Sequence, residues 1–176
     1  MPIVYLREWN GEAPGDPTSK EGEQIQFKSS DDPTVEDIET STNPLTKPQA
    51  GVNRSYEKYL RLYLEDLEGK ASIANLRVYV AGTPPANGMG LFYKVDDEYV
   101  DPLPGGYAAG GAMIGPKSDF FTADADNPIE LGDGPFEDVL EDIGDFLVMQ
   151  AELYPSVALG DYGGQFAIYF GWDENA

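Results

Sequence analysis

The segment from Ser55 to Val80 carries the pattern that most restricts the fold. In its first half leucines occupy every second position, and in its second half apolar residues alternate with Arg77 and Tyr79. Side chains of an extended chain point alternately to opposite faces, so a period of two is typical of strands. We therefore expect two strands joined by a short polar connection around Gly69. Their apolar face would carry Leu60, Leu62, Leu64, Leu76, Val78 and Val80.

A helix over the first half of the segment is the alternative. Ser55 could serve as its N-cap and Gly69 could end it, since both residue types are common at those positions. One apolar stripe at helical spacing would then run along Tyr56, Leu60, Tyr63, Leu64 and Leu67. The local pattern leaves both assignments open, and the helix would make the fold α+β rather than all-β.

The net charge argues against two classes of partner. The chain of 176 residues has 32 Asp and Glu against 11 Lys and Arg, so its formal net charge is 11 − 32 = −21. Affinity for nucleic acid rests on cationic contacts to phosphates, and anionic lipid surfaces attract proteins in the same way. We therefore expect neither nucleic acid nor a membrane among the partners.

The lack of two residue types removes many enzyme classes. The sequence contains no cysteine and no histidine. It therefore offers no disulfide framework, no thiol nucleophile, no imidazole base or metal ligand, and no ordinary Ser-His-Asp triad. The glycine-rich run at 105–115 lacks the Lys and Ser/Thr order of a phosphate-binding loop. We expect no cofactor.

The acidic excess also bears on the environment in which the chain folds. It is spread along a chain poor in lysine, a composition that resembles proteins of salt-loving organisms. At low salt such a charge opposes compaction, and at molar salt a Debye length of about 3 Å relieves the repulsion. An acidic mesophilic domain is the alternative. No early apolar run is long enough for a signal peptide or membrane helix, so we expect a soluble product.

The first fifty residues differ from the rest of the chain. Residues 1–10 have the pattern of a short edge strand, 11–23 are rich in Pro, Gly and acids, and 29–48 have the same loop composition. Between these loops, Ile25 and Phe27 alternate with polar residues as in a brief strand. We expect 1–50 to form a strand and a flexible arm, either mobile or ordered on a neighbouring subunit. Residues 51–176 would form a single β-sandwich domain.

Short strand patterns follow the organising segment, separated by loops rich in Gly, Pro and Asp. They cover 91–95, 146–153 and 165–172, whereas 101–117 has the composition of a projecting loop. Helical spacing of apolar residues recurs only in 136–146. The series predicts an all-β fold: an antiparallel β-sandwich, jelly-roll or Ig-like, with an extended N-terminal arm and one short helix.

Two sets of acids are candidates for chemistry. Asp124, Asp126 and Glu130 supply hard oxygens for Ca²⁺, but the glycine and the distant glutamate of an EF-hand loop are missing, which favours a solvated acidic loop. Asp145 and Glu152, beside an apolar strand, are the carboxylates that could act in a glycosidase pair. No feature marks a matched partner for either. We therefore predict no catalytic residue, no metal site and no enzymatic activity.

Five segments together resemble a group of small structural proteins of tailed viruses. They are 55–62 (SYEKYLRL), 73–78 (IANLRV), 88–94 (GMGLFYK), 145–150 (DFLVMQ) and 166–170 (FAIYF), within a region from about 51 to 172. Proteins of that group are β-sandwich virion components, of the head-decoration or head-to-tail type. The resemblance therefore implies strands at 55–64, and together with the acidity it implies a virus of a haloarchaeal host.

The function implied by this resemblance is that of a non-enzymatic structural protein, made in the host cytoplasm and located in the virion. It would form a homo-oligomer and attach in multiple copies to major capsid or neck proteins, with the N-terminal arm and the 101–117 loop as contacts. The alternative is a carbohydrate- or receptor-binding β-sandwich module, on the virion or in a halophilic cell. In that module Trp9, Trp172 and the tyrosines would stack on sugar rings.

Overall fold

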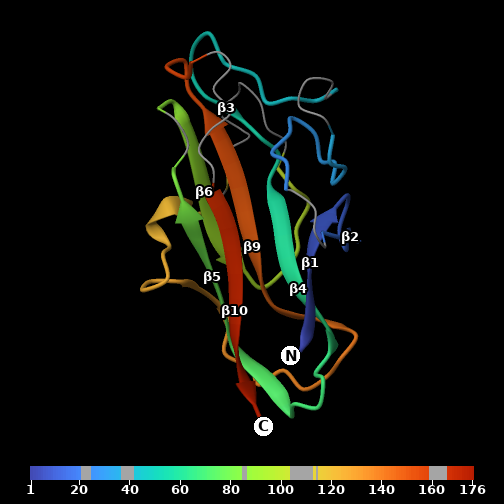
Figure 1. The fold of residues 1–176 in the computed structure, drawn as a ribbon. Helices are drawn as coiled ribbons and strands as arrows, with labels where there is room; N and C mark the ends of the chain where they lie inside the picture. Colours follow the sequence, from blue (N-terminus) through green and yellow to red (C-terminus); the bar gives the residue numbers. More distant parts are fainter. Residues whose placement is uncertain (21–24, 37–41, 85–86, 104–112, 114, 159–165) are drawn as a thin grey trace.

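Two antiparallel sheets pack against each other in a β-sandwich (Figure 1). The computed structural model describes residues 1–20, 25–36, 42–84, 87–103, 113, 115–158 and 166–176. The seven-stranded sheet has the order β2-β1-β4-β9-β6-β7, with β3 beside β9, and the three-stranded sheet has the order β10-β5-β8. The elements are β1 (Ile3–Asn10), β2 (Asp16–Ser19), β3 (Asn53–Arg54), β4 (Lys58–Asp66), β5 (Ser72–Gly82), β6 (Met89–Asp96), β7 (Ser118–Asp119), the 3-10 helix η1 (Phe120–Thr122), β8 (Ile129–Gly132), β9 (Glu141–Leu153) and β10 (Phe166–Asn175).

The segment that restricts the fold forms β4 and β5, one strand in each sheet, so the strand prediction is confirmed and the helix alternative is wrong. The alternating leucines of β4 and the apolar row of β5 face each other across the interior. Burying one such side chain contributes about 1.5–3 kcal/mol, which favours the two-layer arrangement. The six apolar side chains expected on this face are all buried in the main core: Leu60, Leu62, Leu64, Leu76, Val78 and Val80.

The long strand β9 lies at the centre of the large sheet, between β4 and β6. Its side chains alternate as predicted: Leu147 and Met149 enter the main core, and Phe146 and Val148 point to the other face of the sheet. That other face carries a second group of packed rings, which we name the outer aromatic cluster. Its members are Trp9, Tyr59, Tyr99 and Phe146, with ring centroids between 5.0 and 6.0 Å apart.

The helix predicted over 136–146 is wrong. Phe136 forms an isolated antiparallel bridge with Ile73, and β9 already begins at Glu141. Val139 and Leu140 are 42% and 65% exposed, so the apolar spacing that suggested a helix does not mark a buried face. In the described ranges, no helix has the length and apolarity needed to cross a membrane.

The N-terminal arm departs from prediction in two places. Residues 16–19, expected to be flexible, form β2 and pair with the second half of β1. Ile25 and Phe27, expected to form a strand, pack against the main core in irregular structure. The described part of the arm therefore covers the sandwich of its own chain. Of the predicted projecting loop, 104–112 and 114 lie outside the described residues.

Candidate functional site

Asp124, Asp126 and Glu130 are the candidate Ca²⁺ ligands, although a solvated acidic loop is the favoured interpretation. The Asp124 carboxylate accepts hydrogen bonds from the backbone N–H groups of Asp126 (3.0 Å) and Asn127 (2.9 Å), which closes a local turn. These backbone bonds, that from Asn127 first, hold the pKa of Asp124 below its ordinary value. Glu130 lies exposed on β8. Among the residues with described positions, no group of three or more acidic side chains could hold a metal ion.

Glu152 is tied into an ion-pair network. Its carboxylate accepts hydrogen bonds from Arg54 (2.9 Å), Lys117 (2.5 Å) and the Tyr154 hydroxyl (2.6 Å). Burial alone would raise the pKa of Glu152, but the bonds from Lys117, Tyr154 and Arg54 outweigh it and lower the pKa. The Glu152 carboxylate has the opposite effect on the pKa of its hydroxyl partner. Burial, and then Glu152, raise the pKa of Tyr154 to about 12. Glu152 is thus an ionised anchor that holds β3 and Lys117 against β9.

Asp145 has the opposite character, since burial and then the nearby charge of Asp97 raise its pKa, while Arg61 lowers it. A raised pKa suits a general acid. However, Asp145 and Glu152 are seven positions apart on one strand, which corresponds to roughly 23 Å at 3.3 Å per residue. Glycosidase carboxylates lie about 5–10 Å apart, so these two acids do not form such a pair.

The two tryptophans that would stack on sugars in the alternative function are packed against protein. Trp9 belongs to the outer aromatic cluster and meets Phe146 edge to face. Trp172, in β10, is half-buried against the main core. Both indole rings therefore contact the protein itself.

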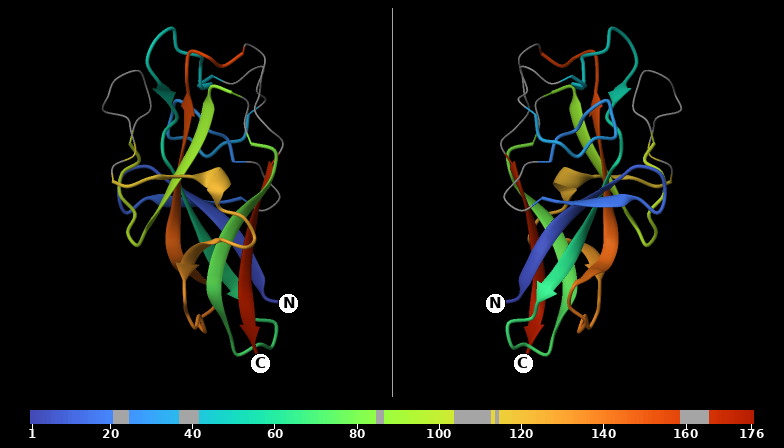
Figure 2. Two further views of the ribbon diagram at one scale, coloured as in Figure 1. Left: turned by 90° about the vertical axis from the view of Figure 1, so that its left-hand side faces the viewer. Right: turned by 90° about the vertical axis from the view of Figure 1, so that its right-hand side faces the viewer.

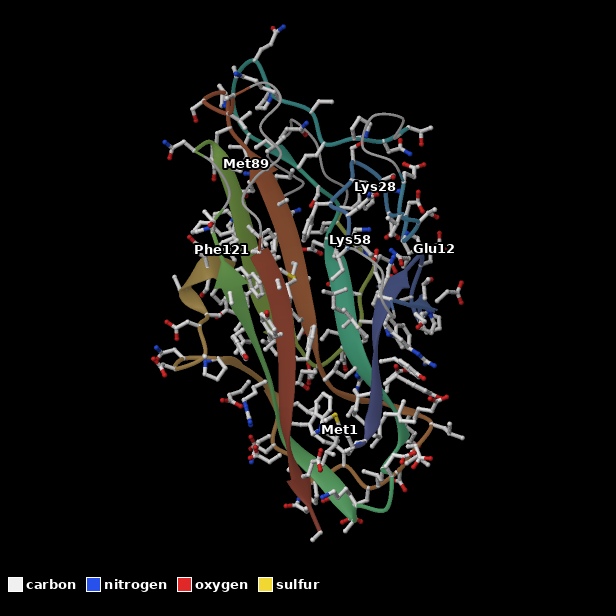
Figure 3. The ribbon with its side chains drawn as sticks, in the orientation of Figure 1. Met1, Glu12, Lys28, Lys58, Met89 and Phe121 are labelled. Carbon is white, nitrogen blue, oxygen red and sulfur yellow. The ribbon has the colours of Figure 1, made fainter. Side chains whose placement is uncertain are left out.

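A buried group of charges lies where the N-terminal arm meets the large sheet. The Glu8 carboxylate lies 2.6 Å from the Lys58 ammonium and 3.3 Å from that of Lys20, and all three side chains are almost fully buried. Lys28, also buried, pairs with Asp32 at 3.1 Å. Figure 3 shows Lys28 and Lys58 close together on the side of the molecule that carries the arm. We name Glu8, Lys20, Lys28, Asp32 and Lys58 the arm clasp.

The arm clasp fastens residues 25–36 to β1 and β4. The Lys58 ammonium donates to the backbone carbonyl of Asp32 (2.9 Å), and that of Lys20 donates to the carbonyl of Pro33. The backbone N–H of Thr34, more than any other contact, holds the pKa of Asp32 at about 2, and Lys28 adds to this effect. Buried charges that are paired and hydrogen-bonded fix one arrangement of the chain. The clasp is therefore a fastening for the arm.

The sequence held a signal for the arm clasp that the prediction missed. Lys58 stands two residues before Leu60 and Glu8 stands two residues after Leu6, so both charges are in phase with the apolar rows of their strands. A strand period of two places them on the core-facing side. A charge in phase with a buried row requires a partner, and the two residues carry opposite charges.

The edge of the small sheet presents a different kind of surface. β10 pairs with β5 on one side, and within the described part of the chain no strand pairs with its other edge. Figure 2 shows β10 along one margin of the molecule. Its segment 166–172 contains no charged residue, although 24% of the whole chain is charged. We name this segment the β10 edge.

The β10 edge exposes side chains on both faces of its sheet. Those that point inward are packed against the main core but only half-buried: Phe166, Ile168, Phe170 and Trp172. On the outer face, Tyr169 is 47% exposed and stacks on Tyr79 of β5, with ring centroids 5.3 Å apart and planes 13° apart. Four residues further along β10, Asp173 accepts hydrogen bonds from Arg77 (2.9 Å) and Asn75 (2.7 Å).

Comparison of the chain with protein-family models, characterised proteins and solved structures finds no significant match. The resemblance to tailed-virus proteins therefore stays a prediction.

Proposed function

We propose that this protein is a non-enzymatic structural component of a tailed virus particle, where it attaches in multiple copies to other virion subunits. The observation that carries the proposal is the β10 edge. A strand at the margin of a sheet offers unpaired backbone N–H and C=O groups to another chain. Soluble proteins usually protect such a strand with lysine, proline or inward charges, and 166–172 contains none of these.

The arm clasp supports the choice of this edge over the N-terminal arm as the attachment surface. The buried ammonium groups of Lys58 and Lys20 donate to the backbone carbonyls of Asp32 and Pro33, so releasing 25–36 would take hydrogen-bond acceptors away from two buried charges. A buried charge that loses its hydrogen bonds is costly in free energy. A rigid sandwich that keeps its arm and presents a ready strand edge binds at a small entropic cost.

Attachment in many copies would make the overall binding to the particle strong even if each contact is modest. In a symmetric particle each copy makes the same contacts, and neighbouring sites raise the effective concentration of every further contact. Modest pairing along one strand is therefore sufficient for stable incorporation. The proposal requires the protein to be a regular part of the virion, next to major capsid or neck proteins.

Lysines introduced along the β10 edge test this role. The test variant is Ala167→Lys with Tyr169→Lys, on exposed positions of the edge strand. The matched control is Ala81→Lys with Tyr79→Lys, because these residues lie directly opposite on the interior strand β5 and on the same face. We expect the edge variant to be lost from purified particles and the control to be retained. Equal incorporation of both variants would rule out the β10 edge as the attachment surface.

A carbohydrate-binding module is the second candidate, and the stacked pair Tyr79 and Tyr169 favours it. Sugar rings pack on exposed aromatic rings, and Tyr169 of this stacked pair is 47% exposed. Such a site needs rings from both strands, so both lysine variants would abolish glycan-array binding. Loss of glycan binding in both variants, with normal particle incorporation, would favour this candidate.

A further inference from the structure

The sequence of the β10 edge is self-complementary in an antiparallel pairing. When 166–172 is laid antiparallel to a second copy of the same segment, with Tyr169 at the centre, large apolar residues meet large ones and small residues meet small ones. The facing residues are Ala167 with Gly171, Ile168 with Phe170, and Tyr169 with itself, and Phe166 faces Trp172 where the register of β10 on β5 shifts between Gly171 and Asp173. Aromatic and β-branched cross-strand pairs of this kind stabilise antiparallel sheets.

We propose that the partner of the β10 edge is the β10 edge of a second copy of this chain, paired antiparallel about a two-fold axis at Tyr169. This inference deepens the proposed function by naming the subunit that the β10 edge binds, a second copy of the chain, so that the dimer is the unit incorporated into the particle, and it rests on the proposal that the β10 edge is required for incorporation. The two small sheets would join into one sheet of the order β8-β5-β10-β10-β5-β8. An isologous contact of this type closes after two copies, so it yields a dimer rather than a fibre.

Both faces of the joined sheet gain contacts. In an antiparallel pair, directly opposite residues lie on the same face, so half-buried Ile168 and Phe170 cover their counterparts across the axis. On the outer face, Tyr169 meets its copy, and the stack with Tyr79 extends from two rings to four. Apolar area that is only partly covered in the single chain becomes buried.

The position of the acidic residues favours the antiparallel arrangement. The charges of β10, Asp173 and Glu174, lie beyond the uncharged segment at the end of the strand. A two-fold axis at Tyr169 places the two copies of Asp173 on opposite sides of the axis. Four residues on each side at 3.3 Å correspond to roughly 26 Å between them. This exceeds a Debye length of about 10 Å at 0.1 M salt, whereas parallel pairing would set them side by side.

A single introduced cysteine tests the axis directly, because the natural chain has no cysteine that could compete. In the dimer the two Cα atoms at 169 lie about 4.5–5.5 Å apart, which suits a disulfide, so Tyr169→Cys should give mostly cross-linked dimer under mild oxidation. The control is Ala167→Cys, which is exposed on the same face of the strand. Its two copies lie roughly 13 Å apart, beyond disulfide reach, and should cross-link little. Equal cross-linking at both positions would overturn the register.

Sedimentation of the cysteine-free chain in molar KCl gives the second readout. We expect a dimer that Tyr169→Lys converts to monomer, because two lysines then meet on the axis. Tyr79→Lys, which removes the same ring stack away from the axis, should stay dimeric. A monomeric natural chain across the micromolar range would overturn the dimer, while loss of the edge variant from particles would still support the proposed function. Conversely, a dimer that is absent from particles would overturn only the function.

Discussion

The ammonium nitrogen of Lys58 lies 2.6 Å from Oε1 of Glu8, and both side chains are almost completely buried. This contact joins the inner faces of β4 and β1, and through Lys20 it reaches the N-terminal arm. Removing two charges from water costs about as much as their attraction returns, so such a pair adds little net stability. The pair instead favours the single arrangement of β1 and β4 in which both charges have a partner, because a buried charge without its partner costs several kcal/mol.

Glu8→Gln should therefore destabilise the protein strongly. The substitution keeps the shape of the side chain and leaves the Lys20 and Lys58 ammonium groups facing a neutral amide. Breaking a buried pair by removing one partner typically costs about 3–5 kcal/mol. Urea unfolding measures the loss, and limited proteolysis within 25–36 shows whether the arm is released.

The control for this prediction is Glu174→Gln, which removes the same charge from the exposed pair with Lys70. Exposed pairs are worth about 0–1 kcal/mol, so this variant should unfold almost like the natural chain. If Glu8→Gln costs no more than Glu174→Gln, the arm clasp does not fasten the arm.

The carboxyl of Glu57 should make stability fall as pH rises. Burial is the main cause of its raised pKa, and Asp96 adds to the effect against the opposing N–H of Leu103 and charge of Lys94. Between the ordinary value of 4.5 and its folded value, the folded state binds the proton more tightly than the unfolded state. Deprotonation in this window therefore lowers the free energy of unfolding. Glu57→Gln stays neutral, so its stability relative to the natural chain should rise with pH.

Asp32→Asn should change stability in the opposite direction to Glu57→Gln. The pKa of Asp32 in the folded protein, about 2, lies below its ordinary value of 3.8. The ionised carboxylate therefore stabilises the fold above pH 3.8, and this stabilisation disappears as the pH falls toward 2. Asp32→Asn should be less stable than the natural chain at neutral pH, and the two should have nearly the same free energy of unfolding near pH 2. Urea unfolding at acidic and neutral pH measures both differences, and the same sign for the two variants would contradict this account.

Gly144 should tolerate alanine much less well than Gly69. Both have positive φ, 69° and 80°, so alanine at either position carries a backbone cost of about 1–2 kcal/mol. A Cβ at Gly144 would also lie 2.5 Å from the carbonyl oxygen of Leu131, whereas at Gly69 it would meet nothing within 4 Å. Overpacking of this kind adds about 1–3 kcal/mol. Similar melting temperatures for the two variants would show that β8 and β9 are less closely packed at this point.

Most of the β-sandwich could be predicted because several segments show the period of a strand. The leucines of β4 also fitted a helix, so the strand prediction there depended on the resemblance, and their burial in the main core confirms it. The arm clasp could not be found in this way, because Glu8 and Lys58 are far apart in the sequence and meet only when β1 pairs with β4. The helix over 136–146 was predicted from spacing alone, and exposed Val139 and Leu140 show that apolar spacing does not prove burial.

Salt should stabilise the fold. With a net charge of −21, repulsion within the compact chain is strong at low ionic strength and is screened when the Debye length falls to about 3 Å in molar salt. We expect the melting temperature to rise steadily from low to molar KCl. An unchanged melting temperature would argue against a halophilic origin.

Quantitative peptide mass spectrometry of gradient-purified virus particles, measured against the major capsid protein, tests the central claim most directly. The proposed function predicts a fixed and reproducible number of copies per particle, with an even number if the β10 dimer is the attaching unit. A chain that is abundant in cells and absent from intact particles would contradict the account and would identify a cellular binding domain instead.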